Sequence, residues 1–214
     1  MSLEKNMKLR KIKVLQIGGL LIVGAILAGC ANSSSAVSMK HGSISISNLQ
    51  STINAITAER IATNTTPENA LTGADLVRAQ LRLKIISFLL HRGASEKGIT
   101  LNPAEVAANR VKIVAQVGGE SAMPAALANA SIAASDLDRY IEDIIIQGSL
   151  RAKLVAPTAT DQEFSIALQK YVSEIGAREK VKLNPRYGTW VAATSDINPV
   201  DATNGAVTDP AKSK

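Results

Sequence analysis

Hydrophobic and polar positions along the chain alternate mostly with the three- and four-residue spacing of amphipathic helices. The first clear stretch carries Leu49, Ile53 and Ile56 on one face, with Ser47 as the expected N-cap. Immediately before it, serine and isoleucine alternate over residues 43–47, which predicts a short strand. The folded part of the chain is therefore expected to begin with a strand that leads directly into a helix.

The second predicted helix is the most apolar one in this region. It begins near Thr72, where Asp75 three residues later has the form of a capping box, and it ends near Gly98. From Leu81 onward its apolar residues fall nearly all round the axis, which is typical of a buried central element. We therefore expect this helix at the centre of a bundle.

Start and stop signals mark four further helices. Asn102 followed by Pro103 is the clearest start, because Asn caps the first turn and Pro fits the first helical position. Thr160 with Glu163 again has the form of a capping box. The expected helix ends coincide with glycine or proline. The four segments cover residues 102–117, 120–129, 135–155 and 160–175.

A second alternating segment, at residues 181–183, predicts another short strand, which can pair with the one near Ile44. Aromatic residues make up only 3% of the chain, so the core must consist of Ile, Leu, Val and Ala. The predicted fold class is all-α: a mainly helical bundle of about six helices, with a short two-stranded β-ribbon that joins the chain ends.

The start of the chain has a different pattern, in which five basic residues precede an apolar run from Val14 to Leu27. This run is shorter than the roughly twenty residues of a membrane-spanning helix and is typical of a secretory signal. Its end, Leu27-Ala28-Gly29-Cys30, resembles the lipobox of bacterial lipoproteins. The resemblance implies that Cys30 becomes the first mature residue and carries diacylglycerol and an N-acyl lipid. The alternative is an uncleaved anchor helix with an incidental cysteine.

Both interpretations place the chain beyond Ser33 outside the cytoplasm, at a membrane surface. Of the 24 basic residues five lie in the leader, and of the 18 acidic residues only Glu4 does, so 19 basic and 17 acidic residues remain. The basic charge therefore gives no argument for nucleic-acid binding. The expected parts are a signal peptide (1–29), a lipidated cysteine with a flexible tether (30–38), a helical domain (39–191) and a disordered tail (192–214).

Few residues of the chain suit catalysis. Cys30 is the only cysteine, and the two histidines, His41 and His91, are too few for a His-based metal site and give little support for a hydrolytic triad. Asp136 and Asp138 are expected in the first turn of a helix, where negative charge offsets the helix dipole. We therefore expect no enzymatic activity, and no cofactor besides the lipid on Cys30.

The order of the predicted elements resembles a known family. A short strand and a helix lead to the long apolar helix with residues 81–90, a glycine stop and capped restart follow at 96–106, and a Gly-Gly turn lies at 116–120. This order and spacing resemble the N-terminal domain of the SurA and PrsA chaperones of the periplasm and cell surface, over roughly residues 37–187. The resemblance implies a domain that binds unfolded or partly folded exported polypeptides.

One part of that family's pattern is missing. Full members insert one or more parvulin prolyl-isomerase domains before the closing segment, whereas only some thirty residues separate Leu154 from Asn184 here. The isomerase activity is therefore not carried over. The alternative to a chaperone-like module is a surface lipoprotein that binds one specific folded partner in secretion or envelope assembly. The sequence indicates no oligomeric state.

Candidate residues for binding such polypeptides are the apolar side chains left over once the helices pack. In the helix after Ser135, we expect Ile141, Ile144 and Ile145 to face inward and the next isoleucine to point elsewhere. Leu83 and Leu90 lie off the main stripe of the long helix. Each of these side chains is either buried against another helix or part of a groove floor. The candidate peptide-binding residues are Leu83, Leu90, Ile146 and Trp190.

Overall fold

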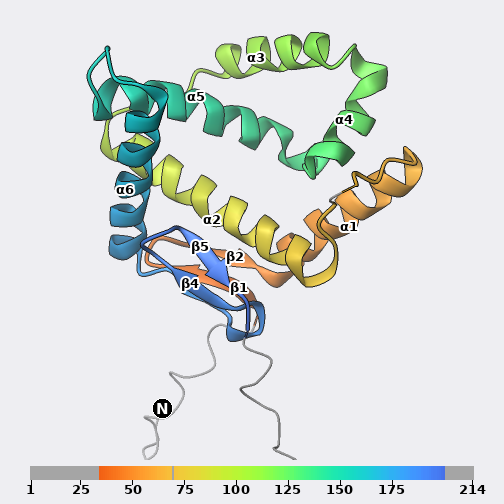
Figure 1. Ribbon diagram of the computed structural model, residues 1–214, viewed down its shortest axis with the longest axis horizontal. Coiled ribbons are helices and arrows are strands. Elements are labelled where there is room, and N and C mark those ends of the chain that lie inside the picture. Colours follow the sequence, from red (N-terminus) through yellow and green to blue (C-terminus); the bar gives the residue numbers. More distant parts are fainter. Residues whose placement is uncertain (1–33, 69, 201–214) are drawn as a thin grey trace, which may run out of the picture. The chain divides into compact units, whose positions relative to one another are not determined.

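The computed structural model describes residues 34–68 and 70–200. The signal peptide, the lipobox residues Leu27, Ala28 and Gly29, the candidate lipid acceptor Cys30 and residues 201–214 lie outside the described residues. The part of the chain that the structure describes is mainly helical, which confirms the predicted fold class (Figure 1). Its helices are α1 (Ile46–Ala62), α2 (Gly73–Glu96), α3 (Pro103–Gln116), α4 (Met123–Ala130), α5 (Leu137–Leu154) and α6 (Asp161–Glu179).

Five short strands form two small antiparallel sheets. They are β1 (Ser35–Met39), β2 (Gly42–Ser45), β3 (Lys182–Leu183), β4 (Thr189–Val191) and β5 (Asp196–Asn198). The first sheet has the order β2-β1-β3, and the second pairs β4 with β5. Val37 of β1 lies opposite Ile44 on one side and Leu183 on the other. The two ends of the described chain are thus joined, but the predicted pairing of 181–183 with the strand near Ile44 is wrong, because β1 lies between them.

Two expected boundaries of the domain are also wrong. Residues 35–38 were expected in the tether, yet they belong to β1, where Ala36 and Val37 are almost completely buried. Residues 196–198 were expected in the tail, yet they form β5, where Ile197 is buried. Each segment contributes only one to three apolar side chains among small polar residues, which is why its composition resembles that of a linker.

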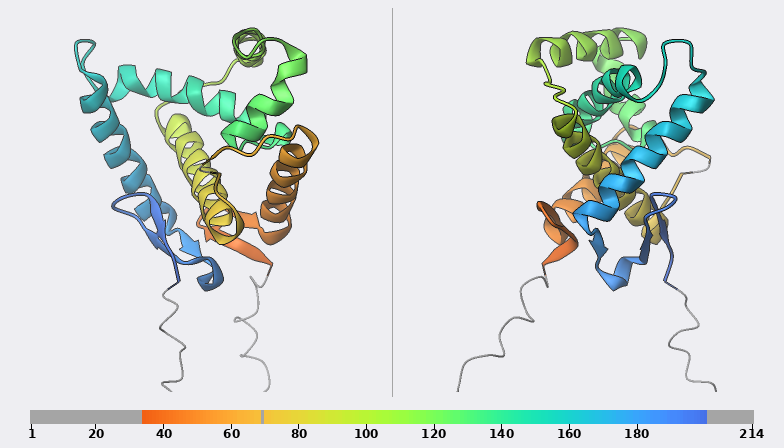
Figure 2. Two further views of the ribbon diagram at one scale, coloured as in Figure 1. Left: turned by 45° about the vertical axis from the view of Figure 1, so that its right-hand side comes forward. Right: turned by 90° about the vertical axis from the view of Figure 1, so that its left-hand side faces the viewer.

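The largest core is built around α2, as its apolar pattern predicts. Leu81, Ile85 and Leu89 have no exposed surface, and α2 packs against α1, α5, α6 and the sheets (Figures 1 and 2). Two glycines allow close packing beside this core. A Cβ atom at Gly42 would lie 2.6 Å from the Phe88 ring, and one at Gly93 would lie 2.7 Å from the Tyr171 ring.

A second apolar cluster joins α3, α4 and the first half of α5. It contains Met123, Leu127, Leu137 and Ile141, with Val106, Ile113, Val114 and Val117 of the α3 region packed against it. These four side chains therefore form the inner face of the α3 region. The second half of α5 turns to the first core, to which it contributes Ile146 and Leu150.

The helix starts confirm some predicted caps and correct others. Asn102 and Thr160 accept the expected backbone hydrogen bonds, and Thr160 forms a complete capping box with Glu163. The cap of α1 is Ser45 and not Ser47, because the helix begins two residues earlier than expected. Thr72 stands at the start of α2, but its side chain makes no capping bond.

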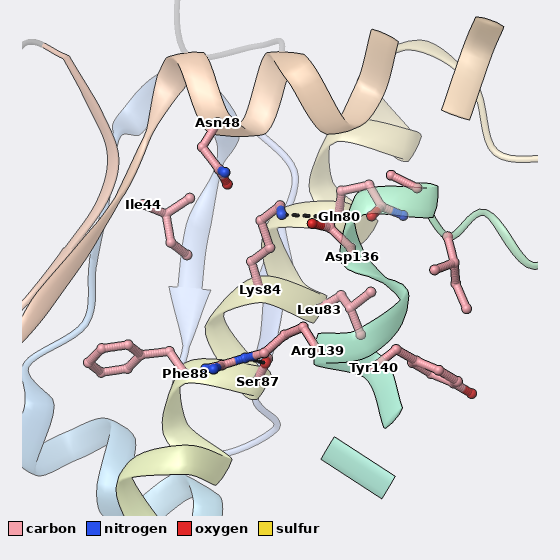
Figure 3. Close-up of a pocket in the computed structure, with 12 residues that line it drawn as sticks. Ile44, Asn48, Gln80, Leu83, Lys84, Ser87, Phe88, Asp136, Arg139 and Tyr140 are labelled. Carbon is pink, nitrogen blue, oxygen red and sulfur yellow. Dashed lines mark hydrogen bonds and ion pairs between the residues drawn. The ribbon is translucent and has the colours of Figure 1, made fainter. Parts of the chain in front are cut away.

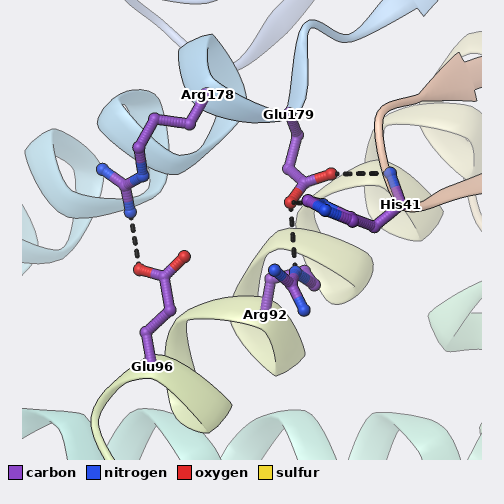
Figure 4. A network of polar contacts seen from close by, with 5 residues as sticks. All are labelled: His41, Arg92, Glu96, Arg178 and Glu179. Carbon is purple, nitrogen blue, oxygen red and sulfur yellow. Dashed lines mark hydrogen bonds and ion pairs between the residues drawn. The ribbon is translucent and has the colours of Figure 1, made fainter.

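A buried carboxylate fastens the turn between β1 and β2 to the helices. Glu179, at the end of α6, is 3% exposed and accepts hydrogen bonds from the His41 backbone (3.1 Å) and from Arg92 Nε (3.0 Å) of α2. Its Oε1 also lies 2.8 Å from His41 Nδ1 (Figure 4). Burial alone raises the pKa of this carboxyl, but the hydrogen bonds from His41 and Arg92 outweigh it and hold the pKa below its ordinary value of 4.5.

Candidate functional site

A cleft opens between α1, α2 and the start of α5, and we call it the first cleft. Its volume is about 200 Å³, and Figure 3 shows side chains from all three helices and from β2 converging on it. It is lined by Ile44, Asn48, Gln80, Leu83, Lys84, Ser87, Phe88, Ile132, Ala133, Asp136, Arg139 and Tyr140.

The apolar side chains of the first cleft belong mainly to α2 and α5, two helices that also contribute to the apolar cores. Leu83 and Phe88 belong to α2, and Tyr140 belongs to the first turn of α5. Leu83 and Tyr140 are 36% and 37% exposed, so both large side chains keep an open surface on the same cleft. Apolar surface that stays open in a recess is a common mark of a binding site.

Ion pairs and hydrogen bonds fix the polar wall of the first cleft. Lys84 Nζ lies 2.8 Å from Asp136 Oδ2, which also accepts a hydrogen bond from Thr52 of α1 (3.0 Å). The expected role of Asp136 in the first turn of a helix is therefore only part of the picture, since its carboxylate joins three helical segments. Asn48 makes no side-chain hydrogen bond within the described residues, so its amide remains available to a ligand.

Ser87, which lines the first cleft, lies close to a histidine and an aspartate, but the three do not form a catalytic triad. Ser87 Oγ donates directly to Asp143 Oδ1 at 3.0 Å and accepts from Arg139 Nε at 2.8 Å. His91 Nε2 lies 3.2 Å from the same carboxylate oxygen without the angle of a hydrogen bond. In a triad the imidazole bridges the hydroxyl and the carboxylate. Here the hydroxyl bonds to the carboxylate directly, with no imidazole between them, so the network lacks the arrangement of a triad.

The structure separates the four candidate peptide-binding residues. Leu83 lies on the first cleft, as a binding residue should. Ile146 has no exposed surface and is part of the main core, so its candidacy is wrong. Leu90 is 3% exposed and contributes only to the floor of another cleft. Trp190 is half-buried against the main core, so its ring acts mainly in packing.

Tyr140 was missed as a binding residue. The sequence places it in the inward stripe of its helix, three residues from Leu137 and next to Ile141. Those two neighbours are buried in the second core, whereas Tyr140 lies at the side of that stripe and reaches the first cleft. Within the sequence of one helix, an apolar residue that packs against another helix has the same spacing as one that lines a cleft.

Two further findings concern only residues 34–68 and 70–200. No three His, Cys, Asp or Glu side chains in this part gather closely enough to hold a metal ion. None of its helices combines the length and the apolar character that a membrane span requires.

Comparison of the chain with protein-family models, with curated proteins and with solved structures finds no match.

Proposed function

We propose that this protein is a lipid-anchored, extracytoplasmic module of chaperone type, which binds unfolded or partly folded exported polypeptides without changing them chemically. The observation that carries the proposal is the first cleft, in which Leu83 and Tyr140 keep open apolar surface beside polar side chains. The element order that resembles the SurA and PrsA domain supports the same function.

The size of the first cleft suits one large apolar side chain of an extended client. Burial of each CH₂ group is worth about 0.8 kcal/mol, so a leucine or phenylalanine would gain about 2–3 kcal/mol before ordering costs. Such a contact is weak on its own and can be released without ATP. Several contacts along a client, each made and broken independently, would delay its aggregation.

The polar wall would form hydrogen bonds with the backbone of the bound polypeptide. The Asn48 amide can both donate to and accept from a peptide group. The Arg139 guanidinium, half-exposed at the same wall, adds donors for carbonyl oxygens. Backbone contacts of this kind do not depend on sequence, which fits a binding site for many clients.

The proposal is tested by the aggregation of reduced insulin in the presence of the lipid-free domain. We expect suppression at equimolar domain, and we expect Leu83→Asp to reduce it severalfold, because a carboxylate in the cleft opposes apolar side chains. Ile166→Asp is the matched control, since Ile166 is 59% exposed on α6 and does not line the first cleft.

Three outcomes would contradict the proposal. The first is no suppression by the wild-type domain, and the second is equal suppression by both aspartate variants. The third comes from crosslinking in cells, where capture of a single stoichiometric partner would favour the alternative of one folded partner. A broad set of exported proteins supports the chaperone function.

The lipid anchor needs a separate test, because Cys30 lies outside the described residues. We expect the wild-type protein to incorporate radioactive palmitate and to fractionate with membranes, since two or more acyl chains hold a protein firmly to a bilayer. Cys30→Ser should abolish the labelling and leave the leader uncleaved. Palmitate labelling that persists in this variant would refute the anchor.

A further inference from the structure

A second cleft lies between α2, α5, α6 and the turn that joins β4 to β5, and the proposed function does not use it. Its volume is about 420 Å³. Four aliphatic side chains contribute to it, from Ile86, Leu90, Leu168 and Val172. The other lining residues are polar, namely Arg82, Gln147, Ser165, Gln169, Thr194 and Ser195.

Ser195 has two unusual properties for a residue in a short turn. The residue is only 5% exposed, and its buried side-chain hydroxyl has no hydrogen-bond partner among the described residues. Its backbone is left-handed, with φ at 52°, which is costly for a residue with a side chain. A buried hydroxyl without a partner costs stability, so a ligand oxygen that accepts a hydrogen bond from it would remove that cost.

Arg82 supplies the only charge among the lining residues of the second cleft. Its Nε donates to the Ser195 carbonyl at 3.0 Å and lies 3.3 Å from Asp196 Oδ1, outside the lining. Neither terminal nitrogen of the guanidinium has a hydrogen-bond partner within the described residues. Two parallel N–H groups of this kind match the two oxygens of a carboxylate.

We propose that the second cleft binds an aliphatic monocarboxylate. The carboxylate would pair with the terminal nitrogens of Arg82 and accept a hydrogen bond from the Ser195 hydroxyl, and the aliphatic part would lie on Leu90 and its three apolar neighbours. No acidic residue lines the cleft, and Asp196 lies at Arg82 Nε, so the terminal nitrogens of Arg82 remain open to the anion. This site is separate from the first cleft and does not depend on the chaperone proposal.

The same chemistry has two natural sources, namely the free C-terminus of a polypeptide that ends in an aliphatic residue and a fatty acid. Titration calorimetry distinguishes them with three probes: acetyl-Ala-Ala-Ala-Leu with a free carboxylate, the same peptide as its amide, and octanoate. Trp190 is the only tryptophan and belongs to the β4–β5 pair, so its fluorescence reports binding independently.

We expect the free-acid peptide or octanoate, or both, to bind with a dissociation constant at least tenfold lower than that of the amide. Arg82→Gln should remove this preference. Ser195→Gly should weaken binding severalfold without loss of fold, because glycine accepts the left-handed backbone. Arg78→Gln, one turn earlier on α2 and outside the second cleft, should bind as the wild type does.

Binding of the acid peptide alone assigns the site to polypeptide C-termini, and binding of octanoate alone assigns it to fatty acids. The proposal is overturned if neither carboxylate binds, if acid and amide bind equally, or if Arg82→Gln keeps the preference. Circular dichroism of each variant shows that a lost preference does not come from unfolding.

Discussion

At the residue scale, the buried Glu179 carboxylate makes the clearest long-range polar contacts of the described residues. It joins three segments that are far apart in sequence, because His41 lies in the first turn, Arg92 near the end of α2 and Glu179 at the end of α6 (Figure 4). A parallel contact between Arg178 and Glu96 (2.6 Å) lies on the more exposed side. Of these two carboxylates Glu179 is the buried one, since the Glu96 side chain is 38% exposed.

This carboxylate should make stability depend on pH in the acid range. Because its pKa is lower in the folded chain than its ordinary 4.5, its contribution is complete above that value and is lost as pH falls through the folded pKa. We expect Glu179→Gln to lower the free energy of unfolding by about 2 kcal/mol at pH 7. The deficit relative to the wild type should shrink as the pH is lowered to 3.

Urea unfolding of both proteins at the two pH values measures this. Glu174→Gln is the control, since Glu174 is exposed on the same helix, and we expect a change within about 0.5 kcal/mol. A deficit for Glu179→Gln that is the same at pH 3 and pH 7 would contradict the pKa argument.

Residue-level predictions succeed where the partner is local. The capping box of Thr160 and Glu163 involves two residues three positions apart, and the sequence contains all of it. The role of Asp136 depends on Lys84, fifty-two positions earlier, and no spacing rule contains that contact. The same holds for Glu179, whose partner His41 is 138 positions away.

At the element scale, α5 shows why a correct helix can have its faces assigned wrongly. It serves two cores: Ile141 faces the α3–α4 cluster, and Ile146 faces the main core. The sequence shows a helix with a surplus of isoleucines, and its spacing predicts a single apolar face that points inward. Because α5 is buried on two sides, Ile146 outside that stripe is as buried as Ile141 inside it, whereas Ile144 in the stripe is 45% exposed.

A pair of alanine substitutions tests this assignment. Ile146→Ala removes a side chain with no exposed surface and leaves a cavity, so we expect a loss of about 2–5 kcal/mol in the free energy of unfolding. Ile144→Ala, on the exposed side of the same helix, should change it by less than about 0.5 kcal/mol. Chemical denaturation of both variants measures the difference. Equal losses would show that α5 is not packed in this way.

At the scale of the whole molecule, the ends of the described chain stabilise each other. β1 pairs with β3, and the β4–β5 pair brings Trp190 and Ile197 onto the main core beside α2 and α6. The helical bundle and its order followed from periodicity and caps. Of the strands, β2 and β3 also followed from alternation, but β1, β4 and β5 did not, because these segments of three to five residues carry too few apolar positions to show a pattern.

Two truncations test the importance of the closing strands. Deletion of residues 188–214 removes the buried surface of Trp190 and Ile197, so we expect a loss of at least about 3 kcal/mol and a Tm lower by about 6–12 °C. Deletion of residues 201–214 alone removes no residue of either sheet and should leave Tm unchanged within about 2 °C. Thermal unfolding followed by circular dichroism compares them. Equal Tm values for the two truncations would show that the β4–β5 pair contributes little.

The position of β1 has a mechanical consequence. The chain that precedes Ser34, where we propose a membrane attachment, enters the domain through the middle strand of the β2-β1-β3 sheet. A pull from the bilayer would load the backbone bonds to both neighbouring strands at once, instead of peeling away an edge strand one bond at a time. The domain would therefore resist unfolding by a force on its N-terminal end better than so small a sheet suggests.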